Sequence, residues 1–113
     1  MRILNTSSNT VLAEEAVIGE GLLERMKGLL GKDGLKPGEA LVLKPCSAVH
    51  TFFMRFSIDV VFVDNALRIV RAIPDLKPWR LTGIYPSARM CIELPAGTLA
   101  STKTSHGHLL SLC

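Results

Sequence analysis

Two neighbouring stretches of β-branched and aromatic residues constrain the fold of this chain more than any other feature. Residues 58–63 read IDVVFV and residues 67–73 read LRIVRAI. Residues of these types favour extended backbone, and the intervening Asp64-Asn65-Ala66 is suited to a tight turn. The pattern therefore predicts a β-hairpin.

Weaker strand patterns occur on both sides of this hairpin. Residues 40–44 form an apolar run that ends at a proline, and residues 109–112 predict a final short strand. In residues 90–94, apolar and polar side chains alternate, which predicts a strand with one face turned inward. Residues 2–17 predict two short extended segments around a polar stretch, with a weak alternating face made of Val11, Ala13 and Val17.

Helical spacing of apolar residues occurs in one place. Leu22, Leu23, Met26, Leu29 and Leu30 share one helical face, and Gly31 is a stop signal. This segment is the only helix that we expect. Residues 74–86 contain three prolines and the only Trp and Tyr of the chain, which indicates a long, ordered surface loop.

These elements indicate a mainly β fold. Its 113 residues are enough for one hydrophobic core, so we expect residues 1–113 to form a single domain. Short strands with frequent Gly and Pro turns are typical of a sandwich or a partly closed, jelly-roll-like barrel, here with one short helix packed at its end.

Charge and hydropathy narrow the classes of partner. The longest apolar runs fall far short of the roughly 20 residues that a membrane helix requires, so we expect no membrane span. Basic residues outnumber acidic ones by 13 to 10, and the excess lies after residue 39. Nucleic-acid-binding proteins usually carry a denser basic stripe with interleaved aromatic residues, so weak nucleic-acid binding is a less favoured alternative.

The three cysteines, Cys46, Cys91 and Cys113, are widely spaced and form no CxxC motif. The spacing indicates neither a disulfide framework nor a zinc site, so we expect no metal and no cofactor, and interpret Cys91 as a small buried apolar residue. A reducing compartment fits this interpretation. No export signal is visible, which predicts a cytoplasmic protein, or an exported one if a leader precedes this sequence.

Several motifs resemble one known family. The segments RMKGLLG at residues 25–31, HTFFMRF at 50–56, IDVVFVD at 58–64 and IELPAG at 92–97 are similar, in this order, to the bacterial domain-of-unknown-function family 192. The resemblance implies a compact, mostly β, sandwich or jelly-roll-like domain and no established catalytic mechanism. Many members of that family carry an export signal or a membrane anchor.

Two acidic residues within strand patterns are candidates for catalysis. Asp59 shares a strand face with Val61 and Val63, where an ionised carboxylate needs a partner, such as Arg55, Arg89 or backbone N–H groups. A structural role is the main interpretation. If Glu93 shared a cleft with Asp59, the pair resembles the acid and base of a glycosidase, with His50 as a further candidate.

The candidate binding residues lie mainly near the proline-rich loop. Trp79 stands between a proline and an arginine, a setting that suits an anchoring contact. We therefore expect a non-enzymatic module in which Trp79, His50, Arg55 and Arg89 line a groove for a small polar ligand or a peptide. The alternative is a small hydrolase or carbohydrate-active enzyme that uses Asp59, Glu93 and His50.

Two further groups of cysteine and histidine residues are weak candidates for chemistry. Cys46 and His50 lie four residues apart, but a nucleophile and its base are recognised by geometry in space. His106 and His108 have the spacing of half a metal site, although an exposed connection explains them better.

Overall fold

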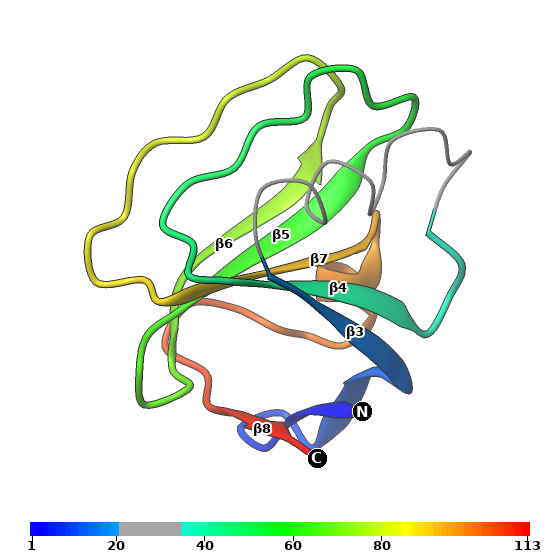
Figure 1. The fold of residues 1–113 in the computed structure, drawn as a ribbon. Helices are drawn as coiled ribbons and strands as arrows, with labels where there is room; N and C mark the ends of the chain where they lie inside the picture. Colours follow the sequence, from blue (N-terminus) through cyan, green and yellow to red (C-terminus); the bar gives the residue numbers. More distant parts are fainter. Residues whose placement is uncertain (21–34) are drawn as a thin grey trace.

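The computed structural model describes residues 1–20 and 35–113, so the helix predicted over 22–30 lies outside the described residues (Figure 1). In the described part, the elements follow in the order β1 (Ile3–Asn5), β2 (Thr10–Ala13), β3 (Glu15–Glu20), β4 (Glu39–Lys44), β5 (Ile58–Val63), β6 (Ile69–Leu76), β7 (Met90–Pro95), α2 (Thr98–Ser101) and β8 (Leu110–Leu112). Strands dominate, which confirms the mainly β prediction.

The strands form two sheets. The larger has the order β3-β4-β7-β5-β6, and the smaller has the order β2-β1-β8. All pairs are antiparallel except β3 and β4, which run parallel. In Figure 1 the smaller sheet lies below the larger one, with both chain termini beside it. The arrangement is that of an open sandwich.

One hydrophobic core fills the space between the sheets. The smaller sheet contributes Ile3, Leu12 and Leu110, which pack in the same buried cluster as Val61 and Ile92 of the larger sheet. Alternate residues of β5 and β7 point to this side because successive side chains of a strand face opposite ways.

A second core lies on the opposite face of the larger sheet. Phe62 and Cys91 belong to it, together with Val49 and Met54 from the segment before β5 and Ala88 from the segment before β7. Strand β7 is therefore buried on both faces from Met90 to Leu94, and the prediction of a single inward face was wrong. Within residues 1–20 and 35–113, loops cover this side of the sheet.

The predicted hairpin is confirmed. Strands β5 and β6 pair antiparallel, with Val63 opposite Ile69 next to the turn. Asp64 closes the turn, because its Oδ1 accepts hydrogen bonds from the backbone N–H groups of Ala66 and Arg68 at 2.9 and 3.0 Å. Such side-chain acceptance is why Asp favours turns.

Two local predictions need correction. The segment before residue 20 forms three strands, and Val11 and Val17 are exposed while Leu12 and Ala16 are buried. The helix α2 was not predicted. It is a single turn that follows Gly97, at φ 94°, and it buries only Leu99. One turn is too short to produce a periodic apolar pattern.

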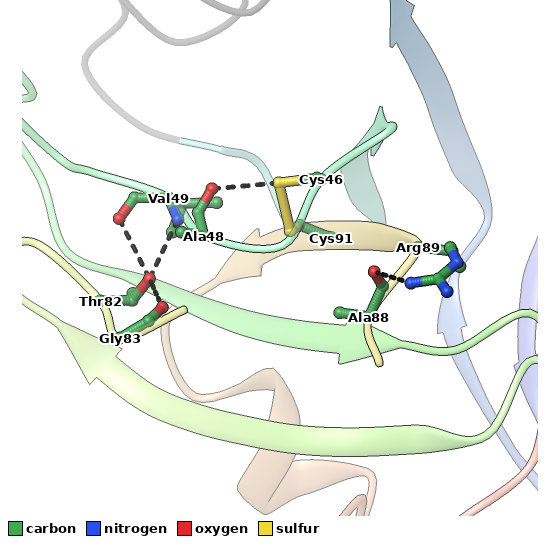
Figure 2. The surroundings of a disulfide bond; sticks show 8 residues. All are labelled: Cys46, Ala48, Val49, Thr82, Gly83, Ala88, Arg89 and Cys91. Atoms are coloured by element: carbon green, nitrogen blue, oxygen red, sulfur yellow. Dashed lines mark hydrogen bonds between the residues drawn. A yellow bond between two sulfur atoms is a disulfide. The ribbon is translucent and has the colours of Figure 1, made fainter. Parts of the chain in front are cut away.

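The prediction that the cysteines form no disulfide was wrong as well. Cys46 and Cys91 are bonded, with their Cα atoms 5.6 Å apart (Figure 2). Strand β4 pairs with β7 so that Leu43 lies opposite Cys91, and the chain leaving β4 returns over that position. The two cysteines are 45 residues apart in sequence, and they meet only because of this strand register. The spacing of cysteines in the sequence does not reveal the register. Cys113 is a free, exposed cysteine.

A buried asparagine ties the smaller sheet to the C-terminal segment. The Oδ1 atom of Asn5 accepts the N–H groups of Ser7 and Ser8 at 3.0 and 3.1 Å, and its Nδ2 donates to Thr104 Oγ1 at 2.9 Å and to His108 Nδ1 at 3.0 Å. Asn5→Ala is expected to lower the free energy of unfolding by about 3 kcal/mol, because the buried Thr104 hydroxyl and three partly buried hydrogen-bonding groups lose their partner. Urea unfolding measures this change.

Asn65→Ala is the matched control for that substitution. Asn65 is exposed in the β5–β6 turn, so its loss is expected to change the free energy of unfolding by less than about 0.5 kcal/mol. Equal effects of the two substitutions would contradict a structural role for Asn5.

Candidate functional site

Two loops lie side by side over the second core. They comprise residues 46–57 and 77–89 and are called the loop pair below; Figure 1 shows them in green and yellow. Backbone N–H groups of Trp79, Thr82 and Tyr85 donate across the pair to the first loop at 2.9 to 3.0 Å. The loops are therefore fixed to each other along their length. The predicted loop over 74–86 starts later than expected, because residues 74–76 belong to β6.

Thr51 is the central connection. It is fully buried, its Oγ1 donates to the carbonyl of Lys77 at 2.6 Å, and the same oxygen accepts the N–H of Arg80 at 2.9 Å. Its carbonyl also accepts the N–H of Trp79 at 2.9 Å. One threonine thus satisfies the backbone on both sides of Trp79 and determines where that residue lies.

Thr82 makes the corresponding connection from the second loop. Its Oγ1 accepts the N–H of Val49 at 3.0 Å, and its own N–H donates to the Val49 carbonyl at 3.0 Å. Figure 2 shows this contact on the side of the loop pair near the disulfide. Together with Cys46, which the disulfide attaches to β7, it holds the start of the first loop against the sheet.

The loop pair presents a group of rings in contact, called the aromatic cluster below: His50, Phe52, Phe53 and Trp79. Ring centroids are 4.9 Å apart for His50 and Phe52, 6.1 Å for Phe52 and Trp79, and 4.7 Å for Phe53 and Trp79. Phe53 is 64% exposed and Trp79 is 56% exposed. These separations are typical of favourable aromatic pairs, so the rings support one another at the surface instead of filling the core.

Two of these residues have an unusual backbone. Phe53 has φ 66° and Trp79 has φ 62°, in the left-handed region that bulky residues rarely occupy. Each such residue costs about 1–3 kcal/mol that surrounding contacts must offset. The bonds to Thr51 hold Trp79 in this conformation and project its ring outward.

The charged residues of the loop pair are all basic. The loop pair contains Arg55, Lys77, Arg80 and Arg89 and no acidic residue. Asp75, just before the second loop, accepts a hydrogen bond from Lys77 Nζ at 2.6 Å. This bond lowers the pKa of the Asp75 carboxyl. The loop pair is therefore predominantly cationic.

The structure brings together only part of the predicted binding set. Trp79 and His50 meet through Phe52, and Arg55 lies in the same loop as the rings, exposed and next to the buried Met54. Arg89 lies near the start of β7, and its Nη1 donates to the carbonyls of Pro86 and Ala88. Figure 2 shows its side chain directed away from the Val49–Thr82 contact.

Asp59 has a structural environment. It is fully buried, its Oδ1 accepts the N–H of Asp75 at 2.8 Å, and its Oδ2 accepts the N–H of Leu99 at 2.8 Å. These two partners are backbone groups and not the side chains of Arg55 or Arg89. This carboxylate joins β5 to β6 and to α2.

Glu93 does not share a cleft with Asp59. Strands β5 and β7 pair so that Asp59 lies opposite Leu94 and Val60 lies opposite Glu93. Directly paired residues point to the same side of a sheet, so the two carboxylates face opposite sides. The glycosidase-like pairing of Asp59 and Glu93 is not favoured by this geometry.

Among the described residues, the remaining candidate nucleophile and metal ligands do not form a catalytic or metal site. Cys46 is in the disulfide and is not a free thiolate partner for His50, and His50 Nδ1 accepts the N–H of Phe52 at 3.3 Å. His108 Nδ1 bonds to Asn5, whereas His106 is exposed. Within residues 1–20 and 35–113, no group of three or more His, Cys, Asp or Glu side chains could hold a metal ion.

Sequence reasoning did not identify Thr51, Phe52 and Phe53 as part of the site. Two adjacent phenylalanines after a buried threonine are typical of core residues, and strict alternation would send their rings to opposite faces. The left-handed turn at Phe53 places both rings at the surface. One signal was available in the sequence. The HTFF segment precedes the predicted hairpin and the loop with the only Trp follows it, so pairing of the two strands brings these segments to the same end of the hairpin.

Comparison with known proteins places the chain in a family. The DUF192 family model, described as "Uncharacterized ACR", matches residues 3–112. UPF0127 protein PH1112 of Pyrococcus horikoshii is 37% identical over 111 residues, covering 93% of each chain. UPF0127 protein TK1120 of Thermococcus kodakarensis is 26% identical over 113 residues, covering 96% of this chain and 71% of the relative. These relatives are archaeal, so the expectation of a bacterial family was too narrow.

A solved structure shows the same fold. A protein of unknown function from Novosphingobium aromaticivorans superposes with a TM-score of 0.82 at 16% identity, covering 98% of this chain and 82% of that chain. In the described part of the present chain, no helix has the length and apolar character needed to cross a membrane. The chain belongs to the DUF192 family, to which the family model and the UPF0127 relatives both assign it.

Proposed function

We propose that this protein is a non-enzymatic binding module that captures a protein or peptide segment through the aromatic cluster. The observation that carries the proposal is the outward projection of Phe53 and Trp79 by a left-handed backbone at both positions. Backbone strain of this kind persists at functional sites, where the position of a side chain matters more than the free energy of folding.

The composition of the surface supports a macromolecular partner. Exposed Trp and Arg residues are enriched among the contacts that dominate protein interfaces, and rigid aromatic rings lose little conformational entropy on binding. The exposed apolar residues Leu81 and Ile84, at 69% and 74%, extend the apolar surface along the second loop. A small polar ligand would make little use of this extension.

Glycine substitution separates binding from stability. Trp79→Gly is expected to weaken peptide capture by about tenfold or more, because the anchoring ring is lost. The melting temperature is expected to stay within about 3 °C, because glycine relieves the left-handed strain and offsets the lost ring contacts. The measurement uses peptides selected with the intact chain from a random displayed library, titrated as free peptides, together with thermal unfolding by circular dichroism.

Val17→Ala is the matched control for an exposed apolar residue outside the loop pair. Val17 is 65% exposed on β3, and its substitution is expected to leave peptide affinity unchanged. A large loss of thermal stability for Trp79→Gly with unaltered capture would show that the ring serves packing and would overturn the proposal.

A further inference from the structure

We infer that the segment captured by the aromatic cluster is acidic and carries at least one apolar anchor side chain, an inference that rests on the proposed function. The first support is the distribution of charge along the chain. The loop pair contains four of the 13 basic residues and none of the 10 acidic ones, which leaves nine basic and ten acidic residues elsewhere. The net positive charge of the protein is thus concentrated in the loop pair, and Arg55, Lys77 and Arg80 belong to the segments that carry the rings, whereas Arg89 lies at the other end.

The second support is the position of Arg80 beside Trp79. Arg80 is exposed, and its Nη1 reaches only the carbonyls of Pro78 and Trp79 in its own loop, at 3.4 and 3.5 Å. In the described part of the chain these bonds leave Nε and Nη2 for a partner. A guanidinium offers paired donors that match a carboxylate, so an Asp or Glu next to the anchor residue would be recognised here.

Lys77 contributes less to this recognition. Asp75 accepts its hydrogen bond at 2.6 Å, and both side chains are more than half exposed. If Asp75 is counted with the loop pair, the net charge of this region is still positive. Attraction between a cationic surface and an acidic segment would act mainly on the association rate and on specificity, and would weaken as salt is added.

Ring geometry argues against a single-stranded nucleic acid as the partner. Single-stranded nucleic acid binds by stacking its bases on aromatic faces that are open to solvent. His50 stacks on Phe52 at 4.9 Å and Phe52 on Trp79 at 6.1 Å, so the ring faces between them are already covered, and Phe53 is tilted by 58° against Trp79. A segment that lays an apolar side chain against the outside of the cluster does not need those faces.

A preorganised backbone also argues against an anionic bilayer. The buried Thr51 hydroxyl and the left-handed conformations of Phe53 and Trp79 fix the rings in defined positions. A fluid interface rewards exposed apolar area and positive charge without requiring such positions. Fixed anchors increase affinity for a partner of defined shape, because less side-chain entropy is lost on binding.

The test is a selection from a displayed library of random peptides against the intact chain. We expect the selected peptides to be enriched in Asp and Glu and to share a Trp, Phe or Leu. Their affinity should fall as salt is raised. Arg80→Gln is expected to lower the affinity for the selected peptides about fivefold at low salt. Lys36→Gln removes the same charge from an exposed turn outside the loop pair and should leave the affinity unchanged.

Each other result has a definite meaning. Neutral or basic peptides that still require Trp79 would overturn the acidic partner and leave the proposed function intact. If no peptide is selected, while vesicles of phosphatidylserine and phosphatidylcholine or an oligothymidylate bind, both the inference and the proposed function are wrong. Equal losses for Arg80→Gln and Lys36→Gln would show a nonspecific effect of net charge and would also overturn the inference.

Discussion

Asp59→Ala is expected to lower the free energy of unfolding by about 4 kcal/mol. The carboxylate is fully buried and accepts two backbone hydrogen bonds, from Asp75 and Leu99, both at 2.8 Å. Alanine leaves both donors without a partner in the interior, and each such loss costs about 1–3 kcal/mol, more where the acceptor was charged. Urea unfolding followed by Trp79 fluorescence measures the change.

Two further variants make this result specific. Asp59→Asn keeps one carbonyl acceptor but turns a donor toward the other N–H, so we expect a loss smaller than that of alanine, about 2 kcal/mol. Asp75→Asn is the control: this residue is exposed and has φ 50°, which asparagine tolerates, so a change below about 0.5 kcal/mol is expected. A loss below about 1 kcal/mol for Asp59→Ala would contradict the structural role of this carboxylate.

Removal of the disulfide is expected to have an effect of similar size. A cross-link across 45 residues restricts the unfolded chain, which corresponds to about 4 kcal/mol in the loop-entropy model. The variant with both Cys46→Ala and Cys91→Ala should lose about 3–4 kcal/mol under oxidising conditions. The first loop should also exchange its amide hydrogens faster, because Cys46 attaches its start to β7.

Cys113→Ala is the control for the double variant. Cys113 is exposed and free, so its substitution is expected to change the free energy of unfolding by less than about 0.5 kcal/mol. If the double variant unfolds at the same urea concentration as the unmodified chain, the disulfide makes no contribution.

The sequence was most informative where the relevant interactions are local. The β5–β6 hairpin was predictable because two β-branched segments and an Asp-containing turn specify it within 20 residues of chain. The final strand and β4 followed from apolar runs that end at turn residues or at proline. These patterns report burial and backbone preference, which neighbouring residues determine.

Features that depend on register were not predictable. The disulfide, the burial of β7 on both faces and the opposite orientations of Asp59 and Glu93 all follow from how β7 pairs with β4 and β5. Alternation within one strand does not say which residue of another strand lies opposite it. The cysteine spacing was therefore read as evidence against a disulfide.

The candidate site was predicted only in part, because its full set of residues depends on how two loops meet in space. Trp79 was identified from its setting between a proline and an arginine, and His50 from the chemistry of its side chain; the structure connects them through Phe52. The contribution of Phe53 depends on a left-handed backbone that no pattern of residue types indicates. The position of Arg89 at the other end of the loop pair could not be known before the path of the second loop was known.

The most direct test of the binding surface is a titration of the isotope-labelled protein with a selected peptide, followed by NMR. We predict that the largest shifts occur at the backbone amides of residues 50–55 and 77–84 and at the indole N–H of Trp79. Away from the loop pair, a groove of about 620 Å³ is lined by residues including Arg71, Pro74, Leu99 and His106. Shifts confined to that groove, with the Trp79 indole unchanged, would contradict the account.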